Sequence, residues 1–278
     1  MTAYATCKPN FTAVLLQEDE FALFRDLIYR NAGICLSPSK NQLVADRLAK
    51  RLKHYGLESY GEYFQMITAA VGKTELQMAV DLLTTNETHF FREPKHFEFL
   101  RRCVLPVRKP GRTLRIWSAA CSSGEEPYSI AMVLDEALGN VPWEIVASDL
   151  SMQMLEKARN GLYPIESMME IPSSYLSNCR LKGSGTQKGA LVIERKLRER
   201  VQFVQYNLFE APPKLGEFDV IFLRNVMIYF DQDSKRQVVK RLLSVLHPGG
   251  YFLVGHSETL NGVNDDVRLV QPAVYRKL

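Results

Sequence analysis

The sequence predicts an α/β protein whose larger domain is a mostly parallel sheet with helices on both faces. The first observation is that, from Thr113 onward, short apolar strands alternate with helices: TLRIWSAA precedes EPYSIAMVLDEAL, and WEIVASDL precedes SMQMLEKARN. The second is that the alternation returns with VQFVQYNL, FDVIFLRN, the helix SKRQVVKRLLSVL and the strand YFLVGHS. Such alternation is typical of a doubly wound sheet. The closing VRLVQPAVYRKL adds two short strands that predict an antiparallel edge.

The third observation is that the first part of the chain has helical periodicity and no convincing strand. We therefore expect a helical domain over residues 1–84, a linker over 85–110 that contributes to the active site, and the sheet domain over 111–278. The clearest early helix is KNQLVADRLAKRLKH, residues 40–54. A charge run is usually a solvated face, but the excess of cations over Asp46 here favours an acidic partner. The cations are Lys40, Arg47, Lys50, Arg51 and Lys53.

A segment at about 162–200 interrupts the alternation. It runs through a proline-punctuated stretch into LKGSGTQKGALVIERKL, where glycines at 183, 185 and 189 separate two short strand-like pieces. We interpret it as an inserted antiparallel β subdomain, with a surface loop as the alternative.

Composition and charge narrow the class of protein. A chain of 278 residues, 46% of them hydrophobic, can bury a sizeable core, and a net charge of +4 is too small to predict nucleic-acid binding. No apolar run approaches the roughly 20 residues of a membrane span, and the N-terminus lacks a signal-peptide pattern. We expect a cytoplasmic protein without membrane insertion, and nothing requires more than a monomer. Five cysteines without a CxxC predict reduced thiols and no metal site: Cys7, Cys35, Cys103, Cys121 and Cys179.

The first turn of the sheet, WSAACSSGEEPYS, points to a particular class of ligand. It holds one glycine, Gly124, followed by Glu125 and Glu126. A pyrophosphate there would lack its usual backbone donors and would be repelled by the carboxylates. Asp149 ends the second strand, where such folds place an acid on ribose hydroxyls. An adenosyl group with a cationic tail fits both features, which favours S-adenosylmethionine, although two glutamates at a helix N-terminus are also ordinary dipole complementarity.

Two further segments bear on the substrate. TTNETHFFREP, residues 84–94, combines hydrogen-bonding side chains with Arg92, whose guanidinium could hold a carboxylate through paired hydrogen bonds. Packing of a domain junction by its phenylalanines is an equally good interpretation. RNVMIYFD, residues 224–231, places Tyr229 just beyond a strand, where it could reach the same pocket or cap a core.

Taken together, TTNETHFFREP, RIWSAACSSGEEPYSIAM, ASDLSMQMLEKARNGLY, FDVIFLRNVMIYFD and GYFLVGHSE closely resemble the chemotaxis receptor methyltransferases, the CheR family. The resemblance spans nearly the whole chain and includes the order and spacing of these motifs. It implies a Rossmann-like S-adenosylmethionine-dependent methyltransferase sheet, a small all-α N-terminal domain and an inserted antiparallel β subdomain. It also implies methyl transfer to glutamate side chains on the cytoplasmic domain of chemoreceptors, which gives glutamyl methyl esters and S-adenosylhomocysteine.

The resemblance further implies a role for individual residues. Arg92 and Tyr229 are expected to face the transferring methyl as catalytic residues. Glu126, rather than Glu125, is expected near the methionyl tail, and Asp149 on the ribose. The other expected cofactor-binding residues are Asn86, Thr88 and again Arg92 at the active site, Asn207 and Leu208 around the adenine, and Arg224 and Asn225 along the cofactor.

One position departs from the family pattern, and other functions predict sequence features that differ from those seen here. Members that grip a receptor C-terminal peptide in the β subdomain carry an arginine where this chain has Val192, which argues against such a tether, although Arg195 could compensate. A methyltransferase acting on RNA or a small molecule predicts an acceptor motif such as NPPY in place of RNVMIY. A non-catalytic regulator predicts cofactor binding without turnover, and a nicotinamide oxidoreductase needs the missing glycine cradle.

Overall fold

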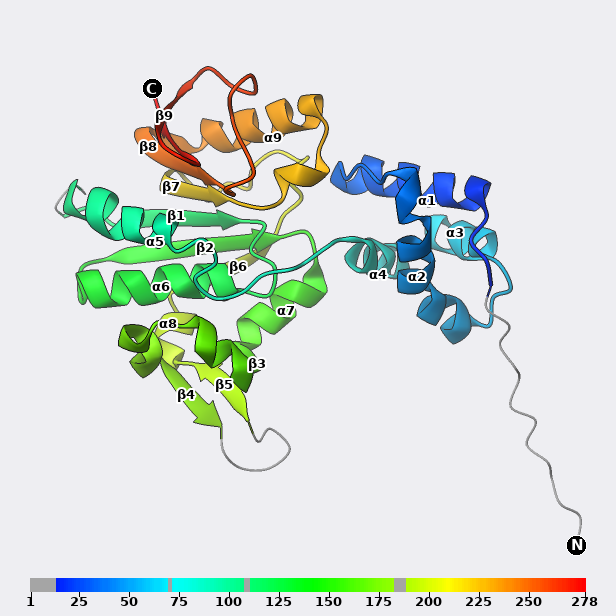
Figure 1. The fold of residues 1–278 in the computed structure, drawn as a ribbon, viewed down its shortest axis with the longest axis horizontal. Helices are drawn as coiled ribbons and strands as arrows, with labels where there is room; N and C mark the ends of the chain where they lie inside the picture. The colour runs from blue at the N-terminus through cyan, green and yellow to red at the C-terminus, as the bar shows by residue number, and fades with distance from the viewer. Residues whose placement is uncertain (1–13, 70–71, 108–110, 183–188) are drawn as a thin grey trace, which may run out of the picture. The chain divides into compact units, whose positions relative to one another are not determined.

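Figure 1 shows the computed structural model of the chain, which describes residues 14–69, 72–107, 111–182 and 189–278. These residues form two compact units. One contains the described residues up to Asn31 together with Cys35–Leu83, and the other contains Ala32–Ile34 and Thr84–Leu278. Within the described ranges, no helix combines the length and apolarity that a bilayer crossing requires.

The N-terminal unit is entirely helical in its described part. Phe24 is at the centre of its core, where its ring stacks on Tyr63 at a centroid distance of 6.2 Å and meets the edge of Tyr60 at 6.5 Å. Local residues set the ends of two of its helices. The side chain of Ser59 accepts the N–H of Glu62 and so caps the start of the helix Tyr60–Thr68, and the helix Asn41–Tyr55 ends at Gly56, which has left-handed backbone. The helices are α1 (Glu18–Ala32), a 3-10 turn (Pro38–Lys40), α2 (Asn41–Tyr55), α3 (Tyr60–Thr68) and α4 (Lys73–Leu83).

The basic surface expected on α2 is smaller than the sequence suggested, so that prediction is wrong in part. Arg51 forms a bidentate pair with Glu75 at 2.7 Å, and the same carboxylate accepts hydrogen bonds from the hydroxyls of Tyr63 and Tyr55. Arg47 donates to the carbonyl of Leu83 at 2.9 Å. These two arginines therefore join α2 to α4, and the exposed cations of the segment are lysines: Lys40, Lys50 and Lys53.

The larger unit contains the predicted sheet, and the fold-class prediction is confirmed. Seven strands lie in the order β6-β2-β1-β7-β8-β10-β9, with all pairs parallel except β8–β10 and β10–β9 at the predicted antiparallel edge. The strands are β1 (Leu114–Ala119), β2 (Trp143–Asp149), β6 (Val201–Gln205), β7 (Phe218–Leu223), β8 (Leu246–Val254), β9 (Val267–Gln271) and β10 (Val274–Lys277).

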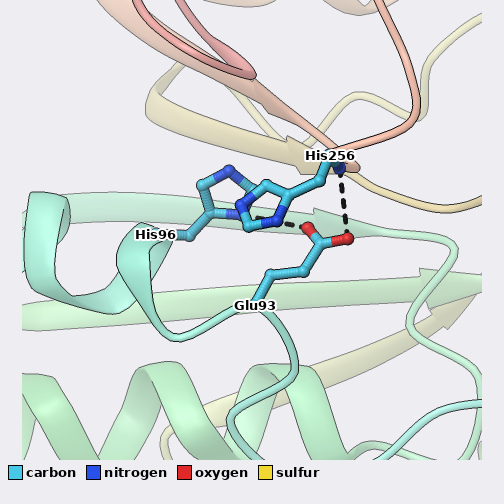
Figure 2. Close-up of side chains that lie close together, drawn as sticks. All are labelled: Glu93, His96 and His256. Atoms are coloured by element: carbon cyan, nitrogen blue, oxygen red, sulfur yellow. Dashed lines mark hydrogen bonds and ion pairs between the residues drawn. The ribbon is translucent and has the colours of Figure 1, made fainter.

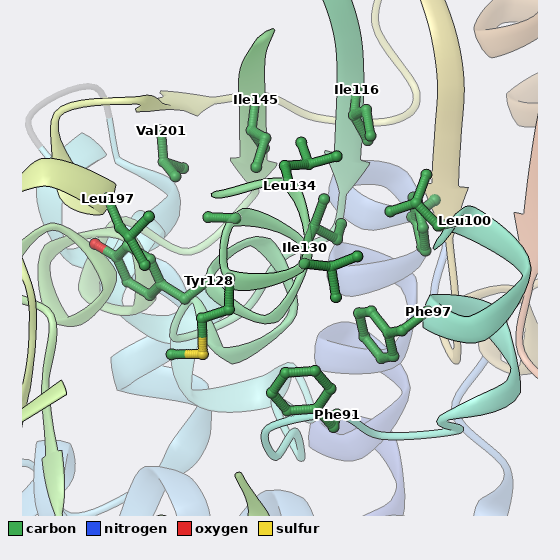
Figure 3. Packing of buried hydrophobic residues seen from close by; sticks show 14 of the residues in the cluster. Phe91, Phe97, Leu100, Ile116, Tyr128, Ile130, Leu134, Ile145, Leu197 and Val201 are labelled. Carbon is green, nitrogen blue, oxygen red and sulfur yellow. The ribbon is translucent and has the colours of Figure 1, made fainter. Parts of the chain in front are cut away.

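Helices cover both faces of this sheet, and the strand residues alternate between two cores (Figure 1). On β1, Ile116 packs with the core beneath α6, whereas its neighbour Trp117 packs with the core beneath α9. Figure 3 shows the α6 side, where Phe91 and Phe97 pack beside Ile130. The helices are α5 (Lys95–Phe99), the π-helical and 3-10 turns Leu100–Val104 and Leu105–Val107, α6 (Glu125–Leu138), α7 (Met152–Asn160), the 3-10 turn Met227–Tyr229 and α9 (Gln232–Ser244).

A second, three-stranded antiparallel sheet lies between α7 and β6 in the chain, as expected for the inserted β subdomain, with strand order β3-β5-β4. Of the three loop glycines, 183 and 185 lie outside the described residues. The elements are β3 (Leu162–Pro164), the 3-10 turns Ile165–Glu170 and Ser173–Asn178, β4 (Cys179–Lys182), β5 (Ala190–Ile193) and α8 (Arg195–Arg198).

Candidate functional site

The carboxyl ends of β1, β2, β6 and β7 meet at one pocket, as the doubly wound topology requires. Its space, including the part open to solvent, is about 970 Å³. Every residue that the sequence assigned to catalysis or cofactor binding lines this pocket, whereas their individual roles stay predictions. These residues are Asn86, Thr88, Arg92, Glu126, Asp149, Asn207, Leu208, Arg224, Asn225 and Tyr229.

The first turn is tight even though it contains a single glycine. Gly124 has φ of +98°, and a Cβ there would lie 2.8 Å from the Cβ of Ala158 and 2.9 Å from the hydroxyl of Tyr163. Ala120 and Ser122 adopt left-handed backbone without being glycines, at φ of 74° and 49°. A non-glycine residue at such angles costs energy, so surrounding contacts must hold this turn in place.

Asp149 supplies one of those contacts. One carboxylate oxygen accepts the N–H of Ser122 at 2.8 Å, and the other accepts the N–H of Ser151 at 2.9 Å. The residue is buried and lines the pocket. Each carboxylate oxygen can accept a second hydrogen bond, so Asp149 can bind a ribose hydroxyl while it fixes the turn.

The two adjacent glutamates have different environments. Glu126 lines the pocket, where it accepts hydrogen bonds from Ser118 Oγ and Arg224 Nη1, both at 2.7 Å. Glu125 instead accepts the hydroxyl of Ser123 at 2.8 Å. Burial raises the pKa of Glu125 to about 7, with the Ser123 hydrogen bond partly opposing it. The geometry thus favours Glu126 as the carboxylate that meets a cationic ligand.

Arg224 is the central cation of the site, with only 2% of its side chain exposed. It pairs with Glu126 and also with Glu93 at 2.9 Å, and it donates to the carbonyl of Arg92. The sequence placed Arg224 along the cofactor; in the structure its guanidinium also ties three segments together. Sequence reasoning missed Glu93, because nothing local shows that a residue of the FREP stretch reaches across to the end of β7.

Glu93 is ionised because of these partners. Burial works against its charge, but Arg224, the N–H of His256 and the amide of Asn225 outweigh burial and lower the pKa of Glu93 to about 2. The donor distances are 3.1 Å from His256 and 3.2 Å from Asn225. Glu93 therefore serves as the fixed counter-charge of Arg224.

Figure 2 shows Glu93 with His96 and His256, whose potential ligand atoms all lie within 4.8 Å of one another. Imidazole and carboxylate groups are common ligands of transition metals. However, both oxygens of Glu93 already accept hydrogen bonds, and a divalent cation would lie beside the Arg224 guanidinium. We therefore interpret the cluster as support for Arg224. Burial, and next Arg224, lowers the pKa of His96 to about 3, so its buried ring is neutral.

The segment that carries Arg92 is bound to the first turn. Ser122 Oγ donates to the carbonyl of Asn86 at 2.9 Å, and Arg92 Nη1 donates to the carbonyl of Glu87 at 2.8 Å. The residues on either side of Arg92, Phe91 and Glu93, have φ of 52° and 59°. Arg92 is half-buried and lines the pocket, so its remaining guanidinium donors can reach a substrate there.

Tyr229 is on the 3-10 turn that follows β7, and Glu258 fixes this turn. Glu258 accepts the N–H groups of Asn225 at 2.8 Å, Gly255 at 2.7 Å and Ile228 at 3.2 Å. A Cβ at Gly255 would come within 2.6 Å of the Asn225 amide, which shows how closely these loops approach. Glu258 is another residue that the sequence alone did not identify.

The remaining wall matches an adenosyl group. Leu208 is buried, and Asn207 Oδ1 accepts the N–H of Phe209 at 3.0 Å, which orders the loop after β6. The pocket thus offers apolar side chains at one strand end, the Asp149 carboxylate at the next, and Glu126 beyond it. A planar base, a sugar diol and a cationic tail are the ligand parts that these groups can bind, so the residues present fit S-adenosylmethionine.

Comparison with known proteins agrees with this chemistry. Residues 86–276 match the family model described as the CheR methyltransferase, SAM binding domain, and residues 19–84 match that of the CheR methyltransferase, all-alpha domain. The chain is 44% identical to chemotaxis protein methyltransferase 2 of Pseudomonas aeruginosa, over 92% of each chain. It is 38% identical to the chemotaxis protein methyltransferase of Escherichia coli, over 99% of this chain and 98% of the relative.

Proposed function

Because the chain belongs to the CheR methyltransferase family, we propose that it transfers a methyl group from S-adenosylmethionine to glutamate side chains on the cytoplasmic domain of chemoreceptors. The observation that supports this best is the convergence of the cofactor-type residues with Arg92 and Tyr229 in one pocket. We place the reaction in the cytoplasm, where such receptor domains lie.

S-adenosylmethionine supplies an electrophilic methyl group on a sulfonium. The protein needs no general base, because a glutamate side chain is already ionised at neutral pH. Arg92 binds the incoming carboxylate and orients one of its oxygens, and Tyr229 limits its approach from the opposite loop. Positioning and exclusion of water therefore provide most of the rate.

Glu126 and Asp149 bind the cofactor at its two polar ends in this proposal. The carboxylate of Glu126 keeps its position because Ser118 and Arg224 hold both of its oxygens. Arg224 also neutralises part of its charge, so Glu126 attracts a cationic group without binding it too tightly. Asn207 and Leu208 bind the adenine edge and face.

The test is methyl transfer from labelled S-adenosylmethionine to a receptor cytoplasmic fragment, with label scored as methanol released by mild base. Base-labile label that disappears when the receptor glutamates become alanine would establish carboxyl methylation. Base-stable label would instead support another acceptor. Tight cofactor binding without transfer to any receptor tried would support a non-catalytic regulator.

Arg92→Ala should abolish transfer, and undiminished turnover would refute the role of Arg92. A matched control is Arg102→Ala, because Arg102 is an exposed arginine near the same segment that pairs only with Glu98 among the described residues. Its turnover should equal that of the wild type.

We also propose that receptor docking uses the exposed lysines of α2 and does not require a peptide tether. Val192 is half-buried on β5, and its backbone pairs with Leu162 and Arg180, so it offers no cation. Arg195 is exposed but pairs with Glu199 at 2.6 Å. Titration of the full chain with a receptor C-terminal peptide tests this: saturable binding that Arg195→Ala removes would restore the tether.

A further inference from the structure

The inserted subdomain contacts the segment that carries Arg92, and this contact suggests a role beyond docking. We propose that Glu170 and Tyr175 of the subdomain are positioning residues, which hold Phe90 and Phe91 so that Arg92 faces the pocket. The kinetic part of the proposal rests on the proposed function, whereas its structural part does not.

The first contact is made to Phe90. The Glu170 carboxylate, at the end of the 3-10 turn Ile165–Glu170, accepts the N–H of Phe90 at 3.0 Å. The buried Phe90 ring meets the ring of Tyr163 edge-on at a centroid distance of 4.9 Å. The Tyr163 hydroxyl in turn donates to the carbonyl of Ser123 at 2.8 Å. The subdomain thereby links the Arg92 segment to the first turn of the pocket.

The second contact is made to Phe91. Its ring stacks on Tyr175 at a centroid distance of 5.0 Å and an interplanar angle of 16°, and its N–H donates to Ser129 Oγ of α6 at 2.9 Å. The Tyr175 side chain is itself buried in this core, so its ring has little room to move. In Figure 3, Phe91 lies against the same core as Phe97 and Ile130.

These contacts matter because the backbone on both sides of Arg92 is strained. Phe91 and Glu93 both adopt left-handed φ, which bulky and branched residues avoid unless their surroundings enforce it. Glu93 is held by Arg224, from the sheet side. Phe91 is held by Ser129 and Tyr175, and Phe90 by Glu170. If the subdomain contacts are removed, the segment can relax and Arg92 moves away from the methyl.

The first measurement is amide hydrogen exchange of residues 86–93, which needs no receptor. Glu170→Ala and Tyr175→Leu should each speed exchange at Phe90 and Phe91 about tenfold or more, whereas Glu170→Gln and Tyr175→Phe should keep wild-type rates. Glutamine retains an oxygen acceptor and phenylalanine retains the ring. The control Arg195→Ala removes an exposed charge from the same subdomain and should change nothing.

The second measurement is methyl transfer by the same variants. Because a misplacement of about 1 Å can cost roughly 100-fold, we expect kcat to fall about 10- to 100-fold in Glu170→Ala and Tyr175→Leu, with KM for the receptor within about threefold and rescue by the conservative variants. Unchanged exchange at residues 86–93 would overturn the proposal, as would lost turnover that the conservative variants fail to rescue. A wild-type protein without transfer would refute the proposed function, while hydrogen exchange would still decide the positioning role.

Discussion

Two titratable groups near the pocket, the buried His96 and the half-buried Glu125, should give the stability of the larger unit opposite dependences on pH, and single substitutions should separate them. His96 is fully buried and its pKa is lowered from 6.5 to about 3 by burial and Arg224. Between these pH values the unfolded chain binds a proton that the folded chain does not, so His96 lowers stability as pH falls. One proton changes the free energy of unfolding by about 1.36 kcal/mol per pH unit, so the loss of stability from pH 6.5 to pH 5 is about 2 kcal/mol.

Glu125 acts in the opposite direction. Burial raises its pKa from 4.5 to about 7, so between these values the folded chain holds a proton that the unfolded chain has released. Its contribution to stability is complete below pH 4.5 and is lost as pH rises through 7. Over the same interval from pH 5 to pH 6.5 the loss is again about 2 kcal/mol. In the wild type the two contributions nearly cancel.

Urea unfolding at pH 5 and pH 6.5, followed by tryptophan fluorescence, measures this balance. Both tryptophans, Trp117 and Trp143, are buried in the large sheet, so the signal reports this unit. In the wild type the free energy of unfolding should be nearly the same at both pH values. In His96→Leu it should be about 2 kcal/mol higher at pH 5 than at pH 6.5, and in Glu125→Gln about 2 kcal/mol lower at pH 5 than at pH 6.5. The control is His54→Gln, an exposed histidine of the helical unit. If both variants keep the wild-type pH dependence, the reasoning is refuted.

Three further predictions test other parts of the molecule. Asp149→Ala should weaken S-adenosylmethionine binding about 10- to 100-fold by calorimetry, because it removes a ribose acceptor and leaves two buried N–H groups unpaired; a twofold change would contradict this. The double variant Lys50→Glu and Lys53→Glu should raise the KM for the receptor several-fold at low salt and leave the affinity for the cofactor unchanged. Arg51→Glu should instead lower the free energy of unfolding of the helical unit by about 3 kcal/mol, as measured in a thermal melt. Gly124→Ala should lower the free energy of unfolding by about 2 kcal/mol, since its φ and its two close contacts both oppose a side chain, and an unchanged urea midpoint would be inconsistent with that turn.

Much of the fold follows from local patterns. Period-two apolar strands that alternate with helices identify the sheet, and the rule that ligands bind beyond the strand ends selects the residues of the pocket. Asp149 ends β2 and Arg224 follows β7 at the pocket, as the strand boundaries in the sequence predict. The predicted family and the predicted cofactor are confirmed by the matches to both CheR family models.

The sequence alone could not show which acidic residue pairs with which arginine. The cations of residues 40–54 lie close together in sequence, but Arg51 pairs with Glu75 twenty-four positions later and becomes part of a half-buried network. Arg224 finds Glu93 across 131 positions. Helical periodicity identifies the face of a helix, but it cannot show which neighbouring element supplies a counter-charge. The prediction of a basic face on the helix of residues 40–54 was wrong in part for this reason.

The glycine-poor turn that first distinguished this chain from dinucleotide-binding proteins has a structural explanation. Among the described non-glycine residues with left-handed backbone, Ala120, Ser122 and Asn225 line the pocket, and Phe91 and Glu93 flank the pocket residue Arg92. Side-chain acceptors hold three of these N–H groups: Ser122 donates to Asp149, Asn225 to Glu258 and Phe91 to Ser129. The strain that glycines would avoid is thus compensated by buried hydrogen bonds. The same bonds direct the Ser122 N–H to a protein carboxylate, so it cannot serve a phosphate. A turn built in this way disfavours an anionic ligand, and the Glu126 carboxylate that follows it in the pocket favours a cationic one.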